Sequence, residues 1–117
     1  MSEAYSISDF LTKNGYISLS KTLRDYNSVN NDLLSVTTAI GYNPKRWTSQ
    51  VWSRDNWLCI LAREYLNGRL ADECHIAVFN TKTKSWQHLV FPKTLIDRWE
   101  NGVTIRAETL ARLNGVF

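Results

Sequence analysis

The residues of this chain that could do chemistry are two cysteines and two histidines, Cys59, Cys74, His75 and His88. Four such side chains form the ligand set of many tetrahedral zinc sites. Both pairs fall in segments that read as neighbouring β-strands, where side chains alternate between the two faces of the sheet. The alternation puts both cysteines on one face and both histidines on the other. Ligands on opposite faces cannot converge on one ion, so the sequence predicts no metal site.

Two glutamates could give the histidines a catalytic role. Glu64 and Glu73 fall on the predicted histidine face and could act with His75 or His88 as acid and base. A half-exposed histidine beside a carboxylate on a sheet is more commonly a surface pair. The chain also lacks the G-x-x-x-x-G-K-[ST], G-x-G-x-x-G and H-E-x-x-H motifs and has no nucleophile elbow around a serine. The sequence therefore favours a protein that is not an enzyme and uses no cofactor.

The middle of the chain predicts a three-stranded antiparallel meander. Strands are expected near 57–65, 71–80 and 85–91, because apolar and β-branched residues alternate there between turn signals. Asn67-Gly68 is typical of a two-residue hairpin turn, and the polar stretch 81–84 forms the second turn. The three strands should pair in the order in which they occur.

The turns also predict which residues face one another. A two-residue turn places Leu61 opposite Cys74, and the second turn places Phe79 opposite Trp86. In this register Cys59 and Cys74 are diagonal neighbours, whose backbones are too far apart for an easy disulfide. We therefore expect both cysteines to be reduced.

Residues 1–41 are predicted to be mostly helical. A first helix should end at Asn14-Gly15, and Ser18 is a candidate cap for a second helix. Residues 33–40 contain several β-branched side chains and favour a strand, although Asp32 could instead cap a short helix.

The whole chain of 117 residues is predicted to be a single α+β domain, a three- or four-stranded antiparallel meander with flanking helices. Its composition, 44% hydrophobic and 21% charged, is that of an ordinary globular protein. The expected parts are a helical region over 1–41, a basic tryptophan-containing connector over 42–56, the meander over 57–91 and C-terminal helices over 92–117. We expect no leader, because residues 1–16 mix serine, glutamate, aspartate and lysine, and no apolar run of about 20 residues occurs in the sequence. We expect a cytoplasmic protein that does not bind membranes.

Positive charge is concentrated in the middle of the chain. Residues 42–96 carry eight basic and four acidic side chains, a net charge of +4, whereas the whole chain carries +3. Basic residues interleaved with aromatic residues suit either a phosphate backbone with stacked bases or the anchor residues of a protein interface. In the alternative interpretation this is a solvated loop whose tryptophans turn into the core. We expect the basic residues within 42–56 to be exposed. The candidate partner-binding residues are Lys45, Arg46, Trp47, Trp52, Arg54, Lys82 and Lys84.

The C-terminal third carries a resemblance. The stretch HIAVFNTKTKSWQHLVFPKTLIDRW, followed by TIRAETLARLNGVF, resembles the front portion of an uncharacterised domain family of phage- and plasmid-borne primase/helicase proteins. The similarity covers about residues 75–117 and consists mainly of structural residues. In that family the portion leads into an ATPase core with a phosphate-binding loop, which this sequence does not include. The resemblance therefore implies an accessory module of mobile-element DNA metabolism, without ATPase or helicase activity.

Together these features favour a small non-catalytic binding protein encoded by a phage or another mobile element. We expect it to bind a host protein or complex, for example as an inhibitor of a host defence (an anti-defence protein) or of a replication factor. The alternative is a nucleic-acid-binding accessory module of mobile-element DNA replication, with DNA or RNA as its partner.

Overall fold

The computed structural model describes residues 4–92 and 104–106. Within these residues a five-stranded antiparallel sheet has the order β2-β3-β4-β5-β6, and β1 pairs separately with β7. The elements are β1 Ala4–Ser6, α1 Ile7–Lys13, β2 Ile17–Ser18, α2 Leu23–Val29, the 3-10 helix η1 Asn31–Leu33, α3 Leu34–Ile40, β3 Trp47–Arg54, β4 Trp57–Leu66, β5 Arg69–Asn80, β6 Trp86–Pro92 and β7 Thr104–Arg106. The predicted α+β class and the meander formed by β4, β5 and β6 are confirmed. Among the described helices, none is long and apolar enough to cross a bilayer.

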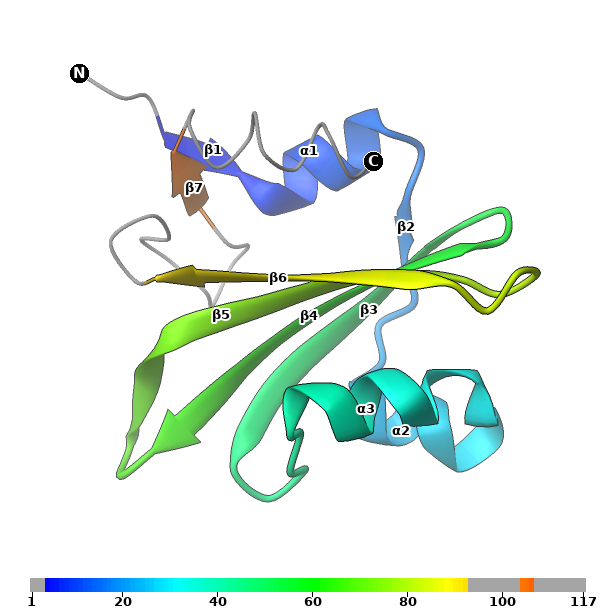
Figure 1. Cartoon of the computed structure of the whole chain (residues 1–117). Helices are drawn as coiled ribbons and strands as arrows, with labels where there is room; N and C mark the ends of the chain where they lie inside the picture. Colours follow the sequence, from blue (N-terminus) through cyan, green and yellow to red (C-terminus); the bar gives the residue numbers. More distant parts are fainter. Residues whose placement is uncertain (1–3, 93–103, 107–117) are drawn as a thin grey trace.

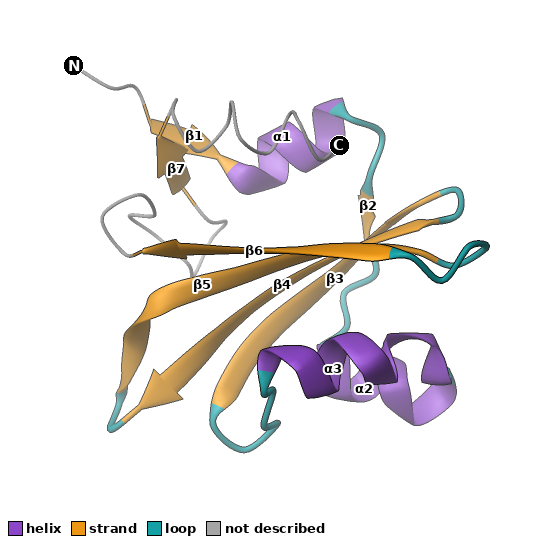
Figure 2. Ribbon diagram, viewed as in Figure 1, coloured by secondary structure: helices purple, strands orange, loops and turns teal. Residues whose placement is uncertain are grey.

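The large sheet has helices on both sides (Figure 1). α2, η1 and α3 pack on one face, and α1 lies with the β1–β7 pair on the other side (Figure 2). On the helical face the strand side chains alternate inward and meet the apolar side of the helices. Each large side chain fully buried in this way stabilises the fold by about 1.5–3 kcal/mol. The buried cluster on this face consists of Leu23, Leu33, Val36, Ile40, Val51, Leu58, Ile60, Ala62, Ala77 and Phe79.

The opposite face of the sheet is also buried and carries the two cysteines. Cys59 and Cys74 are free thiols that lie beside Leu61 and Ile76, while His75 lies on the helical face. The predicted separation of cysteines and histidines onto opposite faces is therefore confirmed. No group of three or more histidine, cysteine, aspartate or glutamate side chains in the described residues could hold a metal ion.

The register of the sheet agrees with the prediction at one turn and departs from it at the other. Phe79 pairs with Trp86, as the polar turn predicts. Leu61, however, pairs with Ile76 and not with Cys74, so the predicted register of β4 and β5 is wrong by two residues. The cause is a bulge between Arg63 and Tyr65. Because the shift is even, each side chain stays on its predicted face.

The N-terminal third differs from the prediction in its second helix. α1 ends as expected near Gly15, whose φ of 85° is the left-handed conformation that glycine adopts readily. Ser18 caps nothing, because it belongs to β2. Helix α2 starts later, and its cap is Thr22, whose side chain accepts a hydrogen bond from the backbone N–H of Asp25 at 3.1 Å.

Residues 33–40 form a helix rather than the favoured strand. Asn30 caps η1 by accepting a hydrogen bond from the Asp32 N–H, and α3 follows directly. The Thr37 hydroxyl donates to the Leu33 carbonyl at 2.7 Å, a bond available to β-branched threonine within a helix. Leu33 and Ile40 lie on the same side of this helical segment and enter the core. Burial of that face outweighs the β-propensity of the segment.

The predicted connector over 42–56 is wrong for most of its length, because 47–54 forms β3 between β2 and β4. The polar composition of residues 47–54 does not indicate a strand, yet Ser49 is buried within it. The Ser49 hydroxyl accepts a hydrogen bond from the Leu23 N–H at 2.8 Å and donates to the Tyr42 hydroxyl at 3.2 Å. The predicted C-terminal helices lie largely outside the described residues, and 104–106 within them are a strand.

Candidate binding surface

The bulge in the β4–β5 hairpin shapes one end of the sheet. Between the pairs Arg63–Cys74 and Tyr65–Leu70, one residue of β4 faces residues 71–73 of β5. The buried Arg63 side chain fixes this irregular stretch, because its Nε donates a hydrogen bond to the Ala71 carbonyl at 2.8 Å. A bulge re-aims the side chains around it. Here those side chains face an open space rather than a regular ladder.

That space is a pocket of about 440 Å³. Three of its lining residues come from the bulge, and the others come from the end of α3, the start of β3 and the middle of β5. Figure 1 shows these segments at the same end of the molecule. The pocket has one indole wall, two carboxylates and one imidazole. Its lining residues are Ile40, Trp47, Glu64, Ala71, Glu73 and His75.

A row of aromatic rings leads from the pocket across the helical face. Trp47 meets Tyr42 edge-on at 6.0 Å between ring centroids and His75 at 5.2 Å. His75 stacks on His88 at 5.1 Å with only 20° between the ring planes, and His88 lies 6.3 Å from Trp86. Strands β3, β5 and β6 each contribute to the row, so the sheet itself holds Trp47 and His75 in place.

The two histidines share a hydrogen bond between Nδ1 of His75 and Nε2 of His88 at 2.9 Å. Such a bond needs one N–H and one free lone pair, so the pair is not intact when both rings are protonated. Burial, and then the neighbouring His88, lowers the pKa of His75, against the opposing effect of Glu73 and Glu64. Burial also lowers the pKa of His88. The predicted pairing with a carboxylate is present as a long contact, 3.8 Å from His75 Nε2 to Glu73 Oε2.

The first three predicted partner-binding residues lie at this same end. Lys45 and Arg46 are exposed in the turn that leads into β3, and Trp47 is half-buried. The Arg46 carbonyl accepts a hydrogen bond from the Tyr65 N–H, which ties the turn to the bulged hairpin. Tyr65 itself is 50% exposed. We call Lys45, Arg46, Tyr65 and the lining of the pocket the pocket end of the sheet.

Two other predicted residues, Trp52 and Arg54, make structural contacts within the fold. Trp52 is buried on the cysteine face, and its Nε1 donates to Gln50 Oε1 at 3.2 Å. Arg54 is half-buried rather than exposed as predicted. Its guanidinium donates to the Asn14 carbonyl at 2.8 Å and lies 4.7 Å from the centre of the Tyr16 ring. Both contacts hold the α1 segment against the edge of β3.

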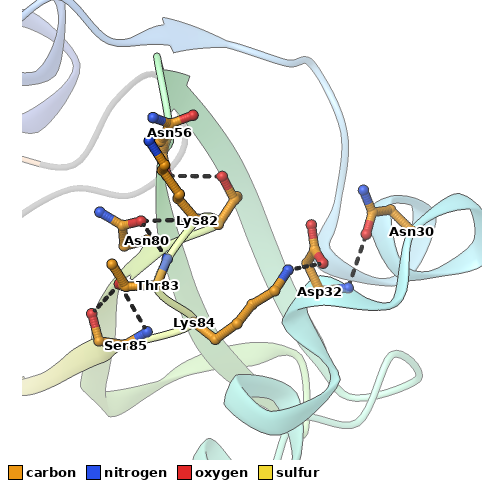
Figure 3. A network of polar contacts seen from close by, with 9 residues as sticks. Asn30, Asp32, Asn56, Asn80, Lys82, Thr83, Lys84 and Ser85 are labelled. Atoms are coloured by element: carbon orange, nitrogen blue, oxygen red, sulfur yellow. Dashed lines mark hydrogen bonds and ion pairs between the residues drawn. The ribbon is translucent and has the colours of Figure 1, made fainter.

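Lys82 and Lys84 lie in the β5–β6 turn at the other end of the sheet (Figure 3). Asn80 Oδ1 accepts hydrogen bonds from the backbone N–H groups of Lys82, at 2.9 Å, and Thr83, at 3.0 Å. Lys84 Nζ forms an ion pair with Asp32 Oδ1 at 2.8 Å, which connects the turn to η1. We call residues 80–85 the turn end of the sheet. Both lysines at this end are exposed, and of the two only Lys84 forms an ion pair among the described residues.

The structure therefore places three of the predicted residues (Lys45, Arg46 and Trp47) at one end of the sheet and two (Lys82 and Lys84) at the other. Trp47 pairs with Glu64, whereas Asn80 pairs with Trp57, seven residues away along β4. At about 3.3 Å per residue the ends are roughly 23 Å apart. Sequence reasoning named His75, Glu64 and Glu73 only as possible acid–base groups and missed Ile40 and Ala71. The bulge and the packing of α3 bring these residues together, and neither has a local sequence signal.

In comparisons with known proteins, no family model, no curated protein and no solved structure matches the chain.

Proposed function

We propose that this chain is a non-catalytic binding protein that contacts a protein partner through the pocket end of its sheet. The observation that carries the proposal is the pocket itself, in which Trp47 stands beside Glu64 and Glu73 while Arg46 lies exposed next to it. Tryptophan, tyrosine and arginine are the residue types that dominate protein interfaces, and a pocket gives an anchor side chain somewhere to enter.

The distribution of charge favours a protein over a nucleic acid. A phosphate backbone that approached Arg46 would also meet the carboxylates of Glu64 and Glu73. Arg54 and Lys84 are engaged by Asn14 and Asp32, and the exposed Lys82 is at the far end of the sheet. The chain thus presents mixed charge at the pocket end rather than a continuous basic stripe.

The chemistry of the thiols and histidines supports a non-catalytic role. Burial raises the pKa of Cys59 and of Cys74, so both remain protonated thiols and poor nucleophiles. His75 and His88 hydrogen-bond to each other rather than to a hydroxyl or thiol that they could activate. Residues 75–117 resemble a domain family of phage- and plasmid-borne proteins. We therefore propose that the chain is encoded by a phage or another mobile element and that its partner is a protein or complex of the host.

A matched pair of charge reversals tests the proposal. Arg46→Glu and Lys82→Glu each invert one exposed basic side chain, at the pocket end and the turn end respectively. Each protein is used to capture partners from nuclease-treated extract of its native cell, and bound proteins are quantified. We expect the unchanged chain and Lys82→Glu to capture one stoichiometric protein. Arg46→Glu should not capture it, because the substitution weakens the binding free energy by about 2 kcal/mol.

Nucleic acid is the second candidate, because Lys82 is exposed in the turn that follows the Asn80–Trp57 pair, and Trp57 and Trp86 border a smaller pocket of about 190 Å³. If DNA or RNA is bound, nuclease treatment removes the partner. Both reversals then weaken binding, and each flattens the salt dependence by about one unit of slope per lost phosphate contact. That outcome contradicts the proposed protein-binding function.

A further inference from the structure

We propose that the pocket receives an arginine side chain of the protein partner. This inference rests on the proposed function and names what the pocket end recognises. It follows from the size of the pocket, from the way its indole wall is held and from the charge that its lining carries.

The size of the pocket suits a single long side chain. Small-molecule sites commonly measure roughly 300–1,000 Å³, so a pocket of about 440 Å³ is near the lower limit. It is open to solvent, with the 68% exposed Glu73 side chain at its rim. A side chain presented on the surface of another protein can therefore enter without any rearrangement of the sheet.

The indole wall is already oriented. Trp47 is in contact with Tyr42 on one side and His75 on another, and it also packs against the buried core cluster. A ring that is fixed before binding loses little conformational entropy when a ligand stacks on it. Cations, and guanidinium groups in particular, are attracted to the face of an indole.

The charge of the lining selects a cation. Glu64 and Glu73 are the charged groups of the lining, whereas the basic Lys45 and Arg46 lie in the adjoining turn and do not line the pocket. The histidine of the lining, His75, is hydrogen-bonded to His88. His75 donates or accepts through Nδ1 toward His88, which leaves Nε2 facing Glu73. Burial and the neighbouring ring lower the pKa of His75, so it is neutral at physiological pH and adds no positive charge to the pocket.

Arginine fits this combination better than lysine. A planar guanidinium can stack on Trp47 and at the same time direct its N–H groups in the ring plane toward a carboxylate. An ammonium group is a compact and strongly hydrated charge that offers no plane to stack. The arrangement of one indole and two carboxylates therefore matches the planar, forked cation.

The test uses the full chain and a capped arginine, N-acetyl-arginine methylamide, as the probe. The matched control probe is the citrulline analogue, which replaces the guanidinium with a neutral urea of the same shape. The readout is the NMR signal of the Trp47 indole N–H and the His75 backbone amide during titration. We expect saturable shifts at both positions with arginine, weaker shifts with the lysine analogue and none with citrulline.

Two single variants assign the contact. Glu73→Gln removes one carboxylate of the pocket, whereas Asp55→Asn removes an exposed carboxylate in the β3–β4 turn at the opposite end. We expect Glu73→Gln to weaken arginine binding about threefold and Asp55→Asn to leave it unchanged. Equal shifts with citrulline, shifts that map away from Trp47, or equal effects of the two variants would overturn the inference.

The result can be separated from the test of the proposed function. If arginine does not bind but Arg46→Glu still abolishes capture of the protein partner, the binding surface stands and only its proposed ligand is wrong. If arginine binds at Trp47 and Arg46→Glu changes nothing, the ligand chemistry stands and the proposed contact surface fails.

Discussion

The pocket end and the turn end of the sheet have similar ingredients and different roles. Each combines basic side chains with a β-hairpin and has a tryptophan, which is Trp47 in the pocket end and Trp86 directly after the turn end. At the turn end, Asn80 and Thr83 make their hydrogen bonds within the turn, and Lys84 is paired with Asp32. At the pocket end, carboxylates and an indole surround an open space.

The difference shows that composition does not locate a binding surface. Polar groups that satisfy one another hold a turn in place and have little left to offer a partner. The pocket end departs from this rule because the bulge interrupts the ladder and leaves side chains without a cross-strand neighbour. Three predictions can break or sharpen this comparison, from the largest expected effect to the smallest.

Replacing Arg63 by methionine should have the largest effect. The substitution keeps most of the buried volume but removes the donor to the Ala71 carbonyl, which leaves a polar group of the bulge unpaired. We expect the free energy of unfolding to fall by about 2 kcal/mol, measured by chemical denaturation. The control is Arg69→Met in the same hairpin, where the arginine is exposed. If both variants are equally stable, Arg63 does not hold the bulge.

Replacing Asn80 by alanine should destabilise the turn end by a smaller amount. The backbone N–H groups of Lys82 and Thr83 lose their acceptor, although water can partly replace it because the turn is exposed. We expect a loss of about 1 kcal/mol in thermal or chemical unfolding. Asn80→Asp, which keeps the acceptor oxygen, should be close to wild type. Binding at the pocket end should not change, and a change there would mean that the two ends are coupled.

The histidine pair should give the smallest effect, a pH dependence of stability. The pKa values of His75 and His88 are lowered in the folded chain, so the unfolded chain binds more protons in the window between these values and the ordinary value near 6.5. The contribution of the two histidines to the free energy of unfolding is therefore fully present above about pH 6.5. It is lost as the pH falls toward the lowered pKa values. Denaturation curves at several pH values measure it. The double variant His75→Asn/His88→Asn should lose this component, and an unchanged slope would contradict the assignment.

The meander was predictable because its signals are local. Alternating apolar residues and the Asn67-Gly68 turn determine β4, β5 and their faces, and the polar turn over 81–84 determines the pairing of Phe79 with Trp86. The separation of Cys59 from His75 follows from the same alternation. These predictions depend only on neighbours along the chain or across one turn.

The other elements depend on contacts between distant residues. The polar composition around Ser49 gives no sign of a strand, since that serine is buried only because the Leu23 N–H and the Tyr42 hydroxyl bond to it. Residues 34–40 are helical because the core accepts one face of that helix, including Ile40. The pocket was missed for the same reason, because it requires both the bulge and the end of α3.

The bulge between Arg63 and Tyr65 also has a consequence for how the molecule can vary. β5 has two more residues than β4 between the flanking pairs. Adding or removing two residues there preserves the alternation of faces, whereas a change of one residue would turn every following side chain over. We therefore expect the hairpin to tolerate a change of two residues at this position better than a change of one. The shape of the pocket can diversify in this way while the rest of the sheet keeps its sequence and its core.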